Sequence, residues 1–124
     1  MRIDVHVRDQ VVPMDYPAGP RRNLTPLEVL LASLTACSGN TLYHVLLNMG
    51  AKPASLEVEA KAERRDQHPT VLTAIELVYH VRGKTLDLGL VERAVGVAES
   101  QFCPVMAMLR PATKIATSWR VNQG

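Results

Sequence analysis

Two cysteines are the residues of this 124-residue chain that could carry nucleophilic or redox chemistry. Cys37 lies within a long apolar segment with helical periodicity, and Cys103 ends a second helical segment, directly before Pro104. Structural disulfides are rare in the cytoplasm, so a cytoplasmic cysteine pair is more often redox-active, metal-binding or simply buried. The residues around each cysteine help to choose among these three interpretations.

A metal site is the weakest of the three. Neither cysteine belongs to a C-x-x-C pair. The four histidines also lack the spacing of metal ligands; they are His6, His44, His68 and His80. The sequence therefore predicts no bound metal and no other cofactor.

Burial without chemistry is the simplest alternative, because a free cysteine packs like a small apolar residue. Two local features argue against it. At roughly 100° per residue, Cys37 shares a helix face with polar residues that either line a pocket or contact another helix: Ser33, Thr41 and His44. Cys103 stands where Pro104 redirects the chain, and a thiolate at the start of a new helical turn is favoured by the helix N-terminus.

Hydropathy patterns predict the elements that position the cysteines. Apolar and polar residues alternate over residues 3–7, 56–62, 71–81 and 115–121, which is the pattern of half-buried strands, and residues 11–12 form a further short strand. Residues 13–23 contain three prolines and a glycine, which favours a loop. A second helix is predicted from residue 86 to residue 102, and Pro104 either kinks or restarts it.

The helix with Cys37 is predicted to run from Thr25 to about Met49. Thr25 is its N-cap, Pro26 suits the first helical position and Glu28 completes a T-x-x-E capping box. Gly50 ends it. Its apolar residues cover most of the circumference, and such a helix is buried. Because a domain this small rarely encloses a helix completely, we expect a second copy of the chain to cover the remaining side.

The order of strands, helix, strand pair, helix and strand predicts an α+β fold, with an antiparallel or mixed β-sheet and two central helices on one face. The length and the 47% hydrophobic content indicate one domain over residues 1–124. The net charge is only +2 and the basic residues are scattered, so no nucleic-acid partner is expected. Residues 1–10 lack the apolar core of a signal peptide, and polar residues interrupt the longest apolar segment, which argues against a membrane span. We expect a cytoplasmic protein.

Two motifs resemble segments of the OsmC/Ohr family, which contains osmotically inducible protein C and the organic hydroperoxide resistance proteins. TPLEVLLASLTAC at residues 25–37 is similar to the helix with the family's first cysteine, and AESQFCPVM at residues 98–106 is similar to the segment with the second. The resemblance covers about residues 20–121 and is closer to the general OsmC-like branch. It implies an OsmC-like intertwined homodimer with active sites at the subunit interface.

The resemblance also implies an activity, the thiol-dependent reduction of organic hydroperoxides by a cysteine-based peroxidase. Cys37 would be the peroxidatic cysteine, which becomes a sulfenic acid, and Cys103 would resolve it as a disulfide. An external dithiol, often of lipoyl type, would restore both thiols.

Two further site residues follow from the family, which usually places an arginine and a glutamate near the first cysteine. Glu28 is the motif-matched glutamate, although its capping role is an equal alternative. Nine residues before Cys37, it faces the opposite side of a regular helix, so the two meet only through a partner subunit or a helix distortion. The glycine-arginine loop of the hydroperoxide resistance proteins is absent. Arg22 and Arg21 are the candidate arginines, with Arg8 behind them.

Two other functions remain open at this point. Without a well-placed arginine, the same apolar interface pocket could bind a small hydrophobic ligand instead of a peroxide. Alternatively, the cysteine pair could sense oxidants without turnover.

Overall fold

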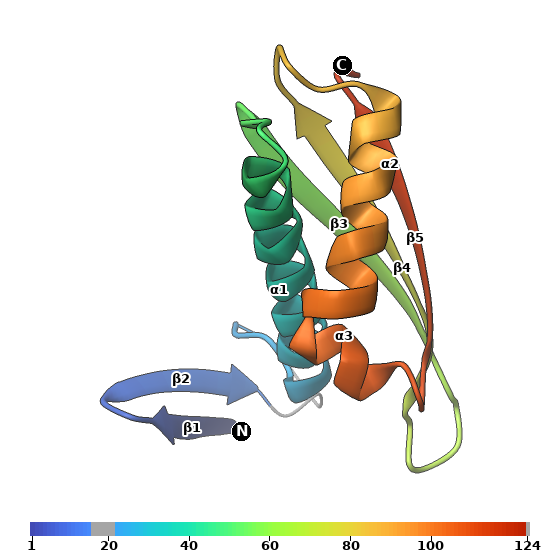
Figure 1. Cartoon of the computed structure of the whole chain (residues 1–124). Helices are drawn as coiled ribbons and strands as arrows, with labels where there is room; N and C mark the ends of the chain where they lie inside the picture. Colours follow the sequence, from blue (N-terminus) through green and yellow to red (C-terminus); the bar gives the residue numbers. More distant parts are fainter. Residues whose placement is uncertain (16–21, 124) are drawn as a thin grey trace. The chain divides into compact units, whose positions relative to one another are not determined.

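The computed structural model describes residues 1–15 and 22–123 (Figure 1). The chain divides into two compact units, Met1–Ala32 and Ser33–Gly124, and the division falls within a helix. The two units are described separately. A single domain over residues 1–124 stays a prediction.

The first unit contains an antiparallel hairpin of β1 (Arg2–Val7) and β2 (Gln10–Asp15). Arg8 lies in the turn with a positive φ of 55°. The predicted loop began at Pro13, and this boundary is wrong, because β2 continues to Asp15. A two-stranded ribbon consists only of edge strands, where the missing N–H of Pro13 is tolerated. Residues 16–21 of that loop lie outside the described residues.

Helix α1 (Pro26–Asn48) has the predicted ends. The capping box is confirmed, because Thr25 N–H donates to Glu28 Oε1 over 3.0 Å and Glu28 N–H donates to Thr25 Oγ1 over 3.4 Å. At the C-terminus, Gly50 adopts a φ of 81° and its N–H donates to the carbonyl of Leu47. A glycine suits this left-handed position, since it has no Cβ.

The second unit contains a three-stranded sheet of β3 (Ser55–Arg64), β4 (Leu72–Arg82) and β5 (Lys114–Val121). The strand order is β3-β4-β5; β3 and β4 are antiparallel, whereas β4 and β5 are parallel. The predicted mixed sheet is confirmed. Parallel strands need a long crossover, and the helices between β4 and β5 supply it.

That crossover consists of α2 (Leu88–Val97), the π-helical turn η1 (Ala98–Phe102) and α3 (Pro104–Leu109). Of the two predicted alternatives at Pro104, the restart is the one observed. Proline disfavours helical geometry at the preceding residue, and Cys103 is accordingly extended, with φ −80° and ψ 103°.

The core of the second unit lies between the sheet and the helices on one of its faces (Figure 1). The side chains of Leu42, Leu46, Val81 and Val91 are fully buried there. Gly39 allows α1 to approach β3 closely, because a Cβ at this position would come within 3.0 Å of a Val58 methyl group.

One side of α1 is buried and the other is not. The buried residues of the helix are Leu34, Ser38, Gly39, Leu42, Val45 and Leu46. Burial on all sides is therefore not reached within one chain, and its completion by a second copy stays a prediction. By length and hydropathy α1 also meets the criterion for a membrane span, but the central helix of a protein core passes the same test.

Candidate functional site

The two cysteines of the second unit lie side by side. The Cys103 S–H donates to Cys37 Sγ over 3.5 Å, and both residues are free thiols. Cys103 is 3% exposed, whereas Cys37 is half-buried. A disulfide bond of about 2.05 Å therefore requires the sulfur atoms to approach by roughly 1.5 Å. The structure thus brings the two predicted redox residues into a close dithiol pair.

Two helical elements hold this pair. Cys37 lies in the middle of α1, two residues before the close contact of Gly39 with β3. Cys103 lies between η1 and α3, where its N–H donates to the carbonyl of Ala98 and its carbonyl accepts from the N–H of Ala107, both over 3.1 Å. Because both backbone groups of Cys103 are bonded, its side chain has a defined position.

The surroundings of Cys37 disfavour a thiolate. Burial raises the pKa of its thiol, and the neighbouring Cys103 raises this pKa further, whereas the backbone N–H of Val105 and the hydroxyl of Thr41 lower it. The Thr41 hydroxyl donates its single proton to the Cys37 carbonyl over 2.7 Å, so it must rotate to support the thiolate. At the N-terminus of α3, the N–H of Val105 lowers the pKa of Cys37, while the predicted effect of this helix on Cys103 stays a prediction.

Sequence reasoning missed two buried hydroxyl groups beside the pair. Ser38 Oγ lies 3.6 Å from Cys103 Sγ, and the hydroxyl of Tyr79 is hydrogen-bonded to Ser38. Burial, followed by the nearby Glu99 carboxylate, raises the pKa of Tyr79 far above its ordinary value. A signal existed in the sequence: Tyr79 falls on the inward face of a predicted strand, and a buried tyrosine hydroxyl needs a partner.

An ion pair borders this group. Glu99 Oε2 lies 3.6 Å from an Arg110 guanidinium nitrogen, which also contacts Met106 Sδ at 3.2 Å. Within the described part of the chain, Glu99 Oε1 is a buried side-chain oxygen without a hydrogen-bond partner. Neither residue was predicted, because the two sit on separate helical elements.

Arg22 and Glu28 belong to the first unit, where both line an open cavity of about 600 Å³. Glu28 accepts the capping bond described above. The Arg22 backbone N–H donates to Asp15 Oδ2 over 2.6 Å, and its side chain is exposed. These two predicted residues therefore line the same cavity, while their role at the thiols stays a prediction. Arg21 lies outside the described residues.

A small cavity of about 220 Å³ begins one helical turn after Cys37. Its lining residues are Asn40, Thr41, His44, Val45, Asn48 and Phe102. Two members of the predicted polar stripe, Thr41 and His44, are among them. This part of the stripe lines a pocket, whereas Ser33 and Cys37 are not among the lining residues.

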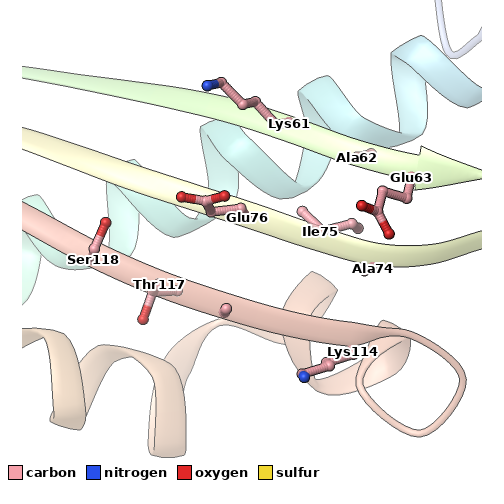
Figure 2. Close-up of a pocket in the computed structure, with 10 residues that line it drawn as sticks. Lys61, Ala62, Glu63, Ala74, Ile75, Glu76, Lys114, Thr117 and Ser118 are labelled. Atoms are coloured by element: carbon pink, nitrogen blue, oxygen red, sulfur yellow. The ribbon is translucent and has the colours of Figure 1, made fainter.

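A larger cavity of about 410 Å³ lies on the three strands of the sheet, and Figure 2 shows its charged residues Lys61, Glu63, Glu76 and Lys114. No cysteine lines it, so it is separate from the thiol pair. Among the described residues, no cluster of three or more His, Cys, Asp or Glu side chains could hold a metal ion.

Comparison with known proteins gives consistent results. A family model described as OsmC-like protein matches residues 19–118. Protein YhfA of Escherichia coli strain K12 is 31% identical over 97 residues, which cover 78% of this chain and 72% of that protein. A hypothetical protein from Aquifex aeolicus VF5 has a TM-score of 0.85 at 28% identity, over 98% of this chain and 87% of that one.

The Organic Hydroperoxide Resistance Protein OhrB of Bacillus subtilis has a TM-score of 0.72 at 17% identity, covering 97% of this chain and 96% of that one. At this identity the likeness shows a shared fold alone. The α+β fold predicted from the order of the elements is therefore confirmed, and the intertwined dimer that the resemblance implied stays a prediction.

Proposed function

This chain belongs to the OsmC-like family, and we propose that it is a thiol-dependent peroxidase that reduces organic hydroperoxides through Cys37 and Cys103. The observation that carries the proposal is the 3.5 Å contact between the two sulfur atoms. The name of OhrB, a structural neighbour, supports the substrate class.

The proposed cycle has three steps. The Cys37 thiolate attacks one peroxide oxygen, the O–O bond breaks and an alcohol leaves after protonation, so that Cys37 becomes a sulfenic acid. Cys103 then attacks the Cys37 sulfur, and a disulfide and water result. A dithiol reductant, with a lipoyl-type dithiol as a candidate, reduces this disulfide by thiol–disulfide exchange and leaves in oxidised form.

The first step needs a positive charge near Cys37, because burial raises the pKa of this thiol. Arg22 is the proposed source, and Glu28 is proposed to orient its guanidinium, since the two side chains line one cavity of the first unit. The capping bond occupies Glu28 Oε1.

A homodimer is part of this proposal. The side of α1 that the chain itself does not cover includes Ala36 and Leu47, and the nearby residues Phe102 and Met108 are 59% and 70% exposed. A second copy would remove this apolar surface from water. The expected location is cytoplasmic, because disulfides there are readily reduced and the cycle requires repeated reduction.

Intact mass spectrometry tests the cycle. After one equivalent of cumene hydroperoxide, the wild-type chain should lose two hydrogens and both free thiols, and dithiothreitol should restore them. Cys103→Ser should instead gain one oxygen on Cys37. Unreacted thiols in the wild type, or peroxide consumption unchanged in Cys37→Ser, would contradict the proposal.

Binding of a small hydrophobic ligand is a second candidate function, favoured by the raised pKa of Cys37 and by the cavity beside it. A ligand that binds the native state raises the melting temperature. Thermal shifts with fatty acids, measured on protein with blocked thiols, would support this function. A redox sensor, the third candidate, would react once per chain and show no turnover with excess dithiol.

A further inference from the structure

Four side chains of the second unit form one continuous buried contact: Tyr79, Ser38, Cys103 and Cys37. Three of them are almost fully buried, with 1% exposure for Tyr79, 2% for Ser38 and 3% for Cys103. They come from a strand, a helix and the junction between two helices, so the contact exists only in the folded protein. Each group carries one titratable or exchangeable proton, and these protons decide the direction of every bond.

The assignment of a donor to each contact begins at the two sulfur atoms. The Cys103 S–H is directed to Cys37 Sγ, so Cys103 has no proton for Ser38. Either atom could donate in the 3.6 Å contact between Ser38 and Cys103, and with the Cys103 proton directed to Cys37 we assign the donor to Ser38. With that proton committed, the Ser38 oxygen is left as an acceptor for the hydroxyl of Tyr79, its other hydrogen-bond partner.

Tyr79 is suited to be the first donor. Burial and the Glu99 carboxylate both raise its pKa, so the phenol stays protonated throughout the pH range in which thiols titrate. The donors therefore run in one direction, from Tyr79 to Ser38, from Ser38 to Cys103 and from Cys103 to Cys37. Donors in such a series strengthen one another in a buried site.

We propose that Ser38 and Tyr79 are positioning residues for Cys103, which hold its sulfur against Cys37 and stabilise it as the thiolate that resolves the sulfenic acid. The reaction step rests on the proposed function, whereas the effect on Cys103 itself does not. In this proposal the two residues act on Cys103 and not on the attack on the peroxide.

The balance of the step shows where the donors act. Cys103 loses its proton and its sulfur attacks the sulfur of the Cys37 sulfenic acid; the S–S bond forms and the S–O bond breaks. The leaving hydroxide takes up one proton and departs as water. Ser38 stabilises the negative charge that Cys103 carries before the attack, and the hydrogen bond with Tyr79 keeps the Ser38 hydroxyl oriented towards Cys103.

The charged and titratable groups around this site come from four elements. Cys37 lies on α1, Tyr79 on β4, Glu99 on η1 and Arg110 directly after α3. The Glu99–Arg110 pair carries no net charge when both members are ionised. Among the described residues, the neutral donors Ser38 and Tyr79 are therefore the main groups proposed to stabilise a thiolate on Cys103.

The first experiment measures the pKa of Cys103 from thiolate absorbance at 240 nm in a Cys37→Ala background, with Cys37→Ala/Cys103→Ser as the blank. Adding Ser38→Ala should leave about tenfold less thiolate at a given pH, the usual size for a hydrogen bond to a charged group. Tyr79→Phe, which keeps the ring, should act in the same direction by about threefold. Ser33→Ala, at an exposed serine of the same helix, is the matched control and should change nothing.

A thiolate fraction unchanged by both variants would overturn the proposal, whatever the activity of the protein. This readout needs no peroxide and separates the positioning role from the proposed function. If Ser38→Ala does not fold, Tyr79→Phe alone decides, because it removes only a hydroxyl group.

The second experiment follows the resolving step in the chain with both cysteines. Dimedone labelling after cumene hydroperoxide should capture more Cys37 sulfenic acid in Tyr79→Phe and Ser38→Ala than in the wild type, with sulfenic acid formation itself unchanged. Equal labelling in all three would overturn the role in resolution. Absence of any sulfenic acid in Cys103→Ser would instead contradict the peroxidase.

Discussion

Polar side chains gather in two regions of this molecule, and they are used in opposite ways. In the first unit, Asp15, Arg22 and Glu28 bring charges to the hairpin end and the start of α1, and the described carboxylate contacts are mostly to backbone N–H groups. In the second unit, Ser38, Tyr79 and Cys103 are neutral hydrogen-bonding groups buried among apolar side chains. In the first unit, backbone N–H groups bind the carboxylates, whereas in the second unit neutral side chains form hydrogen bonds with one another.

The difference explains which residues sequence reasoning found. Charged residues at turns and helix starts belong to local motifs, so they are recognisable in the sequence. Their local hydrogen bonds are sufficient to explain why they are there, without a role at the thiols. The groups that touch the sulfur atoms are inconspicuous in sequence, because a serine in an apolar helix and a tyrosine in a strand are common. Proximity to the thiols, rather than charge, identifies them.

The largest expected effect tests whether the charged region serves the thiols at all. Under the proposed function, Arg22→Ala should raise the pKa of Cys37 and slow its reaction with hydroperoxide by about tenfold, since a nearby cation favours a thiolate. The measurement is the pH dependence of Cys37 alkylation in a Cys103→Ser background. Arg64→Ala, at an exposed strand end, is the control and should leave the alkylation curve unchanged. Equal curves with and without Arg22→Ala would show that the charged residues of the first unit have a structural role alone.

The second prediction concerns the packing that buries the neutral region. Gly39→Val should lower the free energy of unfolding by about 1–3 kcal/mol, because its side chain must overlap Val58 where α1 meets β3. Chemical denaturation measures this. Gly96→Ala is the matched control: no atom lies within 4 Å of its Cβ position, so it should stabilise α2 by about 0.5–1 kcal/mol.

The third prediction separates the two roles of Glu28. Glu28→Gln keeps a side-chain oxygen for the Thr25 N–H and should leave stability within about 0.5 kcal/mol, whereas Glu28→Ala should cost about 0.5–1 kcal/mol. If the carboxylate also orients Arg22, Glu28→Gln should lose peroxidase activity despite its normal stability. Full activity in Glu28→Gln would contradict a role of the carboxylate in orienting Arg22.

The smallest effect is a pH dependence in the charged region. Backbone and side-chain hydrogen bonds from Asn23, and then the N–H of Arg22, lower the pKa of Asp15 from its ordinary value of 3.8. A lowered folded-state pKa means that the stabilisation is complete above about pH 4 and is lost as the pH falls through the folded pKa. In Asp15→Asn this part of the acid unfolding curve should flatten. A curve identical to the wild type would contradict the assignment.

The sequence alone was sufficient for what depends on near neighbours. The ends of α1 follow from Thr25, Glu28 and Gly50, because caps are made within a few residues, and the strands follow from alternation along the chain. The restart at Pro104 follows from the geometry of proline itself. The two cysteine motifs likewise indicate the family, because each is a contiguous stretch of sequence.

Only the tertiary structure decided which groups meet. The 3.5 Å sulfur contact, the bonds that join Ser38 to Cys103 and Tyr79, and the Glu99–Arg110 pair all link separate elements. Their geometry depends on how α1 is seated against β3 and where the chain turns at Cys103. These positions result from the packing of the whole core, a sum over many weak contacts that no local pattern encodes.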